Sequence, residues 1–475
     1  MLKRIKNLFY DLPLTSTGLF ALLLLPSIGL LFLKDHFSLI PAEQEQRFLW
    51  LMTRMNLLQS FEGDSQRSPP RLWQERLGIN MASEIWRRQG RGIWWQAWAD
   101  DGEAYLIVPA IIWPIKSNPL VAAYHFGDLV AIGSNALHRQ QLIQGLEQQP
   151  VKQSISTSDL QRYCKSVLKS GPALMWRPAG LAAISGSMAS ILQFSRFGCL
   201  SLSSDQNKLS WQGVVGLRSL ASAPAFVSAE PSRHYSVSYD LPSKSDSEQI
   251  LLRLSAKKTD LLFGSLLSKK LIQNSLETYY DLQPASRLKL ASAPFSLILH
   301  KQLKGSFKAS LQMQFALPEG PSKWKPILKT IGQRLENRGF IKDTKAVTKN
   351  SQNINGDLFD MTLWRQHQDD SVVGGWAWQQ QNGELTILNI ALGAAPYPAL
   401  IINQSMPPLG GDVMRFSADT AGLNRLGLLD GRWPSLVKQA GEIGIKLNSL
   451  PGIKSDNRHW WWMSGQLRLE PASLP

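Results

Sequence analysis

The stretch "NRHWWWMSGQLRLEP", residues 457–471, holds three consecutive tryptophans followed by alternating apolar and polar residues. Successive side chains of a β-strand point to opposite faces of the sheet, so Trp460, Trp461 and Trp462 cannot all enter one core. The later residues on the face of Trp461 are apolar: Met463, Leu467 and Leu469. Those on the opposite face are polar: Ser464, Gln466, Arg468 and Glu470. The pattern predicts a β-strand whose Trp461 faces a core.

Trp460 and Trp462 then lie on the otherwise polar face, and two interpretations account for them. In the first, a helix or another part of the protein packs on this face and covers both rings. In the second, the two tryptophans form an exposed interaction surface for a lipid interface or a partner, since aromatic residues dominate contact hot spots. Trp460 and Trp462 are the only site residues that the sequence suggests.

The same region suggests an internal duplication. Residues 204–218 can be placed over residues 455–470 when Gly213 is aligned with Gly465, and the apolar faces then coincide. Residues 96–108 and 376–388 form a second pair, because both contain Ala-Trp, a polar turn with Gly-Glu and a β-prone run. The sequence therefore suggests two similar halves.

The rest of the chain predicts an α+β fold with largely antiparallel sheets and packed helices. Residues 307–317, "FKASLQMQFAL", alternate as an antiparallel strand with one solvated face does, and residues 120–133 predict a hairpin. Capping residues and apolar spacing predict helices in three further stretches. These are residues 134–147, residues 157–171, and residues 245–254 with a capping box of Ser245 and Glu248.

An uncharged stretch near the start predicts one transmembrane helix. Residues 12–33 carry no charge, and at 1.5 Å per residue they are long enough for a hydrocarbon core of about 30 Å. Lys3, Arg4 and Lys6 precede them, so the positive-inside rule leaves the N-terminus in the cytoplasm. A cleaved signal peptide is the alternative, although the apolar run is slightly long and no good cleavage site follows it.

These signals divide the chain into five parts. They are a cytoplasmic tail (1–11), a transmembrane anchor (12–34), a juxtamembrane helix and linker (35–70), a first α+β half (71–230) and a second α+β half (231–475). The apolar spacing around Phe48 and Met52 makes the helix in 35–70 either a stalk, an interfacial helix or, by default, the first helix of the folded part.

The chain is basic, with 51 Lys and Arg against 36 Asp and Glu, a formal net charge of +15. Its basic residues are scattered and match no nucleic-acid recognition motif, so the charge suits an anionic lipid surface or acidic neighbours rather than nucleic acid. Cys164 and Cys199 are the only cysteines. They could form a disulfide outside the cytoplasm or remain as two buried thiols.

No catalytic, cofactor-binding or metal-binding pattern is present. The chain lacks the glycine-rich, Walker, G-x-S-x-G and H-E-x-x-H motifs, and its seven histidines do not have metal-ligand spacing. Ser166-x-x-Lys169 and residues 455–457 match two motifs of the penicillin-binding proteins, but the third, Lys-Thr-Gly, does not follow them. An anchored serine hydrolase is therefore only a remote alternative.

Several segments together resemble a family of uncharacterised proteins with one N-terminal membrane helix, best known from cyanobacteria. The segments are "AYHFGDLVAIGSNALHRQQLIQGL" (123–146), "ALMWRPAGLAAI" (173–184), "LSWQGVVGL" (209–217), "PFSLILHKQ" (294–302), "VVGGWAWQQQNGELTIL" (372–388), "VMRFSADTAGLNRL" (413–426) and "MSGQLRLEP" (463–471). The resemblance implies a position facing the periplasm or thylakoid lumen and no site residues. We expect a non-enzymatic, membrane-tethered scaffold or assembly protein, or alternatively a carrier or sensor of a lipid or other apolar ligand.

Overall fold

The computed structural model describes sixteen segments of the chain. They are residues 42–113, 123–147, 159–185, 192–205, 207–217, 250–261, 270–280, 282–302, 307–317, 321–343, 358–367, 371–381, 385–396, 412–429, 435–450 and 460–469. Within these segments no helix has both the length and the apolar character needed to cross a membrane. The anchor predicted at residues 12–34 lies outside them.

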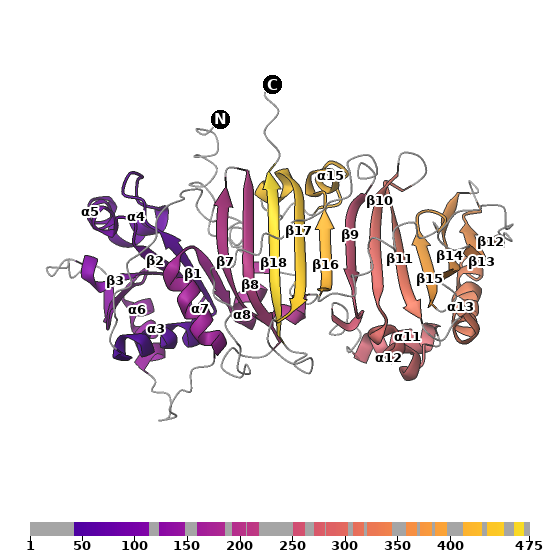
Figure 1. Ribbon diagram of the computed structural model, residues 1–475, viewed down its shortest axis with the longest axis horizontal. Helices are drawn as coiled ribbons and strands as arrows, with labels where there is room; N and C mark the ends of the chain where they lie inside the picture. The colour runs from indigo at the N-terminus through magenta and orange to yellow at the C-terminus, as the bar shows by residue number, and fades with distance from the viewer. Residues whose placement is uncertain are drawn as a thin grey trace, which may run out of the picture. The chain divides into compact units, whose positions relative to one another are not determined.

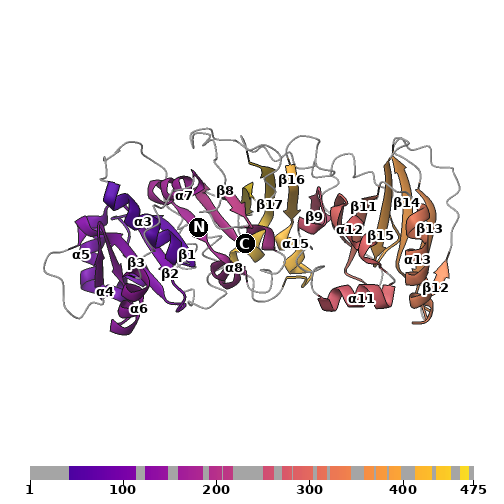
Figure 2. The same cartoon turned by 90° about the horizontal axis from the view of Figure 1, so that it is seen from below.

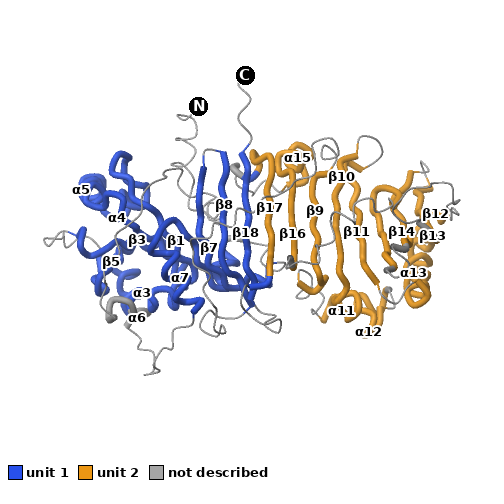
Figure 3. The backbone as a smooth tube through the Cα atoms, viewed as in Figure 1, with its two compact units in different colours: residues 1–236, 432–437, 449–475 blue, residues 237–431, 438–448 orange. Residues whose placement is uncertain are grey.

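The chain forms two compact units (Figure 3). Unit 1 contains residues 1–236, 432–437 and 449–475, and unit 2 contains residues 237–431 and 438–448. The predicted border at 230/231 is close to the first of these borders. The sequence did not indicate that the C-terminal tryptophan strand belongs with the first part of the chain.

The sheet of unit 1 is antiparallel throughout, in the order β4–β5–β3–β2–β1–β6–β7–β8–β18. Its strands are β1 (Leu57–Glu62), β2 (Ile93–Trp98), β3 (Ala104–Pro109), β4 (Ala123–Phe126), β5 (Leu129–Ile132), β6 (Ala173–Trp176), β7 (Phe197–Asp205), β8 (Lys208–Gly216) and β18 (Trp460–Leu469). The helices are α3 (Ala42–Arg54), α4 (Arg71–Leu77), α5 (Ile79–Gln89), α6 (Ala136–Glu147), α7 (Asp159–Ser170) and α8 (Pro178–Ser185), with 3-10 turns at Ala110–Ile112 and Leu192–Ser195.

Helices α3 and α7 lie side by side over one face of this sheet (Figures 1 and 2). Phe48 and Met52 of α3 pack in one buried cluster with Leu160 of α7 and with Leu58 of β1. Among the described residues, α3 is therefore the first helix of the folded part, as the default interpretation has it. Strand β1 falls within residues 35–70, so the folded unit begins earlier than the predicted border at residue 71.

Two tryptophans of unit 1 lie over glycines of the neighbouring strand. Gly198 pairs with Trp176, and a Cβ added to this glycine would lie 2.0 Å from Cζ2 of the indole. Gly465 pairs with Trp211, and a Cβ there would lie 2.3 Å from Cε2. Each glycine thus leaves the room that the neighbouring indole occupies.

The sheet of unit 2 is also antiparallel, in the order β17–β16–β9–β10–β11–β15–β14–β13–β12. Its strands are β9 (Ile250–Ala256), β10 (Phe295–Lys301), β11 (Ala309–Leu317), β12 (Ile341–Asp343), β13 (Leu358–Arg365), β14 (Val372–Gln381), β15 (Leu385–Leu392), β16 (Asp412–Ala418) and β17 (Ala440–Ser449). The helices are α11 (Lys270–Tyr280), α12 (Pro284–Ser292), α13 (Pro321–Glu336), α15 (Thr420–Arg425) and α16 (Ser435–Gln439), the last of which spans the border of the units.

Most local predictions are confirmed. Helices α6 and α7 occupy the stretches predicted from their caps and spacing, and β11 occupies the alternating stretch 307–317. The hairpin of β4 and β5 turns at Gly127, whose φ of 66° lies in the region that favours glycine. The expected α+β class with antiparallel sheets is therefore correct.

The helix predicted at residues 245–254 is wrong. Residues Ile250–Ala256 form strand β9, which is hydrogen-bonded to β10 on one side and to β16 on the other. The capping box at Ser245 and Glu248 lies outside the described residues. Pairing with two strands overrides the local helix signal, because strand formation depends on partners that are distant in sequence.

Candidate functional site

The three consecutive tryptophans lie on β18, and both faces of this strand are covered. Trp460 is 2% exposed and packs in the same cluster as α7, while the half-buried Trp462 ring lies 5.8 Å from the ring of Tyr163 on α7. On the opposite face Trp461 is 7% exposed, with its ring 6.5 Å from that of Phe194. Helix α7 thus covers Trp460 and Trp462, as the first of the two interpretations has it, and the alternative of an exposed aromatic surface is wrong.

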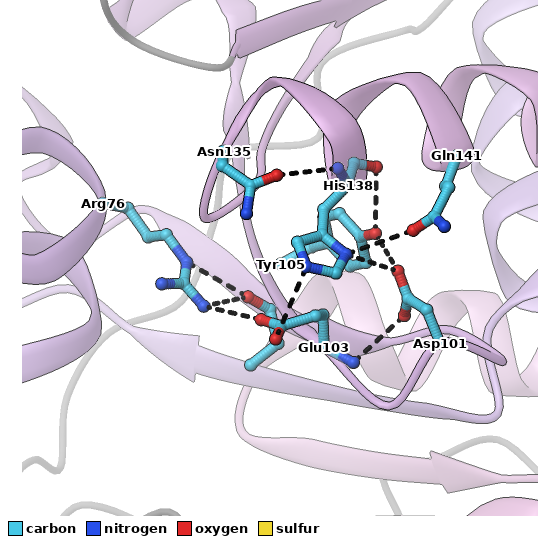
Figure 4. A network of polar contacts seen from close by, with 8 residues as sticks. Arg76, Asp101, Glu103, Tyr105, Asn135, His138 and Gln141 are labelled. Atoms are coloured by element: carbon cyan, nitrogen blue, oxygen red, sulfur yellow. Dashed lines mark hydrogen bonds and ion pairs between the residues drawn. The ribbon is translucent and has the colours of Figure 1, made fainter.

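A network of polar side chains joins three parts of unit 1 (Figure 4). The Tyr105 hydroxyl donates to Asp101 Oδ2 and lies 3.1 Å from the His138 carbonyl oxygen. The His138 ring lies between two carboxylates, with Nδ1 3.4 Å from Asp101 Oδ2 and Nε2 3.7 Å from Glu103 Oε1. Arg76 Nη2 lies 3.4 Å from Glu103 Oε2 and donates to the Ala104 carbonyl at 2.9 Å.

This network acts as a cross-link between α4, the β2–β3 turn and α6. Asn135 and Gln141 hold the start of α6, because Asn135 Oδ1 accepts from the His138 amide and Gln141 Oε1 lies 3.1 Å from His138 Nδ1. Burial and the hydrogen bond to Asp101 raise the pKa of Tyr105 above its ordinary range. A hydroxyl whose proton is held in this way is a poor nucleophile and a poor proton donor. The geometry of the network therefore suits stabilisation of the β2–β3 hairpin.

The residues of the remote hydrolase alternative are not arranged for catalysis. Ser166 is exposed on α7, and the Lys169 ammonium, its only candidate base, lies over the Phe48 ring at 5.0 Å from the centroid. Residues 455–457, the second motif, lie outside the described residues. A nucleophile needs its base within hydrogen-bond reach, and α7 does not place Ser166 and Lys169 in a shared buried pocket.

Cys164 on α7 and Cys199 on β7 are two free, fully buried thiols in one core cluster. Burial is the main cause that raises the pKa of the Cys164 thiol, and an interaction with Cys199 raises it further. Thiols in this state are unreactive. Within the sixteen described segments no group of three or more His, Cys, Asp and Glu is placed to hold a metal ion.

Unit 2 contains a cavity of about 330 Å³ between α13 and strands β12, β13 and β14. Its lining combines three tryptophans with three lysines and two carboxylates. The tryptophans are Trp364, Trp376 and Trp378, the lysines are Lys325, Lys329 and Lys342, and the carboxylates are Glu336 and Asp360. Sequence reasoning missed this site, because its residues come from four elements and no local motif joins them.

A row of buried polar side chains crosses three strands of unit 2. Ser296 on β10 pairs with Gln314 on β11, which in turn pairs with Asn389 on β15. All three are at least 99% buried, and Ser296 Oγ, Gln314 Oε1 and both amide atoms of Asn389 lack a hydrogen-bond partner in the described segments. A buried polar group without a hydrogen-bond partner lowers the stability of the folded chain.

Two consecutive helices of unit 2 expose large apolar side chains. Leu271 on α11 is 82% exposed, Leu288 on α12 is 72% exposed, and α12 has no buried residue. Arg287 Nη1 donates to the Gln273 carbonyl at 2.8 Å and so joins the two helices. Large apolar side chains that are exposed in this way are candidates for contact with a partner.

A comparison of the chain with protein-family models, with curated proteins and with solved structures found no match.

Proposed function

We propose that the chain is a non-enzymatic, single-pass membrane protein that serves as a scaffold or assembly partner on the periplasmic or thylakoid-lumen side. The predicted anchor 12–34, whose residues 12–33 carry no charge and which Lys3, Arg4 and Lys6 precede, supports this location. The resemblance to the membrane-anchored family best known from cyanobacteria supports it as well. A net charge of +15 suits a surface rich in anionic lipid or acidic proteins.

The exposed leucines of α11 and α12 carry the proposal of an interaction role. Leu271 and Leu288 leave most of their apolar surface in water, which costs about 25 cal/mol per Å² relative to burial against a partner. Hot spots of protein interfaces are large side chains that a partner can desolvate. These two helices are therefore the surface on which we expect a component of a membrane complex to bind.

Affinity purification of the tagged full chain from detergent-solubilised membranes tests this role. The Leu271→Ser/Leu288→Ser double variant should lose proteins that co-purify with the unaltered chain. Ile111→Ser is the matched control, because Ile111 of unit 1 is 92% exposed and the exchange is equally polar. Identical sets of proteins from the double variant and from the control would contradict the interaction role. Recovery of the intact chain from the soluble fraction without detergent would contradict the location.

A second candidate function is that of a carrier or sensor of an apolar ligand, which the tryptophan-lined cavity of unit 2 favours. Ligand sites are concave and largely apolar with a few polar groups, and they have volumes of roughly 300–1,000 Å³. The cavity of about 330 Å³ lies at the lower end of this range, so its ligand would be small. Native mass spectrometry of the detergent-solubilised chain should detect such a ligand as an added mass, and repeated spectra without one would contradict the role.

We also propose that the two similar halves suggested by the sequence are an ancient duplication. In unit 1 six neighbouring strands have the order β3–β2–β1–β6–β7–β8. The first five correspond, in the same order, to β11–β10–β9–β16–β17 of unit 2. The sixth, β8, corresponds to β18, the strand that follows β17 along the chain. Two helices separate β1 from β2 along the chain, α4 and α5, and two helices, α11 and α12, separate β9 from β10. Under this correspondence β8 matches β18, in agreement with the alignment of residues 204–218 and 455–470. Residues 96–108, which lie in β2 and β3, match β10 and β11 and do not match residues 376–388.

A further inference from the structure

We infer that the cavity beside α13 binds a small amphipathic anion, a molecule with one carboxylate or similar acidic group on a flat apolar body. The inference rests on the carrier or sensor role proposed above and names the ligand class for that site. It follows from the floor of the cavity, from the charges at its rim and from its volume.

The floor of the cavity is aromatic. Trp364 of β13 and Trp376 of β14 have their rings 5.6 Å apart at an interplanar angle of 48°. Gly332 of α13 faces them, and a Cβ at this glycine would lie 3.2 Å from Trp364 Cζ2. The glycine therefore keeps the helix close to the indoles while adding no side chain to the cavity. A flat apolar group would meet aromatic carbon on this side.

The rim of the cavity has an excess of positive charge. Lys325 is neutralised, because its Nζ lies 2.9 Å from Asp360 Oδ2. Lys329 of α13 and Lys342 of β12 make no ion pair within the described segments, and Glu336 is the one remaining carboxylate of the lining. Two ammonium groups from different elements thus converge on one opening. Such an arrangement attracts an anion and repels a cation of the same shape.

The size of the cavity suits a ligand with one small apolar body. A volume of about 330 Å³ is too small to enclose a two-chain phospholipid. A bicyclic aromatic acid combines a flat apolar body with one negative charge. The aromatic floor and the basic rim therefore select the same class of molecule.

The matched probes 2-naphthoate and 2-naphthamide test the inference, since they share the apolar body and differ in the charge. Saturation-transfer NMR on the full chain in nanodiscs of zwitterionic lipid, with empty nanodiscs as the baseline, measures both affinities. We expect 2-naphthoate to bind at least about tenfold more tightly, the factor that one charge-assisted hydrogen bond supplies. The Lys329→Gln/Lys342→Gln variant should bind the two probes equally.

Lys323→Gln is the control, because Lys323 is exposed on the same helix but does not line the cavity. All three lysines are exposed, so these exchanges leave the core intact. Equal binding of the two probes by the unaltered chain, or an unchanged preference in the double variant, would overturn the anion inference and leave the carrier role standing. Binding of neither probe would overturn both.

Discussion

Replacing Gly465 with alanine tests whether the packing of tryptophan over glycine determines the stability of the unit 1 sheet. A Cβ at this position would lie 2.3 Å from Trp211 Cε2 and 2.4 Å from Nε1, whereas ordinary contacts are 3.4–4 Å. The indole of Trp211, which is only 8% exposed, must therefore move by about 1 Å within a packed interior. Overpacking of this kind costs about 1–3 kcal/mol, and we expect a loss of that size in the free energy of unfolding.

Chemical denaturation of the detergent-solubilised chain, followed by circular dichroism, measures the loss. Hydrogen exchange at the amides of β8 and β18 shows whether it is local. Gly171→Ala is the matched control, because no atom lies within 4 Å of a Cβ at that glycine. Its free energy of unfolding should stay within about 0.5 kcal/mol of that of the unaltered chain.

A double variant identifies the cause. Trp211→Ala alone should cost about 3–5 kcal/mol, since it removes a buried indole. In that background Gly465→Ala should cost less than about 0.5 kcal/mol, because the ring that it clashes with is gone. Costs that simply add, or equal effects of Gly465→Ala and Gly171→Ala, would refute the packing argument.

Three further predictions concern buried polar groups. Tyr105→Phe should lower the free energy of unfolding by about 1 kcal/mol at pH 7, as the hydrogen bond to Asp101 is lost. The folded-state pKa of Tyr105 is raised, so the stabilisation that its hydroxyl supplies is present below about pH 10 and is lost at higher pH. The difference in unfolding free energy between the variant and the unaltered chain should therefore shrink above that pH. A difference that stays constant would contradict this. Asn389→Leu should leave the stability unchanged or raise it by about 1–3 kcal/mol in denaturant titrations, since both amide atoms are buried and have no hydrogen-bond partner in the described segments; a clear loss of stability would contradict this. Cys164 and Cys199 should resist alkylation at pH 8 until the chain unfolds, as mass spectrometry would show; rapid labelling of the native chain would refute their burial.

Local pattern predicted much of the secondary structure but little of the candidate site. The alternation in 460–469 and 309–317 correctly predicted β18 and β11, and caps with apolar spacing predicted α6 and α7. The cavity and the Tyr105 network were missed. Their residues are separated by up to 53 positions in the first case, from Lys325 to Trp378, and 65 in the second, from Arg76 to Gln141. No spacing rule links residues that far apart.

The sequence by itself determined which side chains share a face, because the two-residue period of a strand and the 3.6-residue period of a helix act within a few positions. Only the tertiary structure decided what each face meets. Pairing with β10 and β16 made residues Ile250–Ala256 a strand, and α7 covered Trp460 and Trp462. Both outcomes depend on contacts between distant segments, whose free energy arises when the chain folds and brings those segments together.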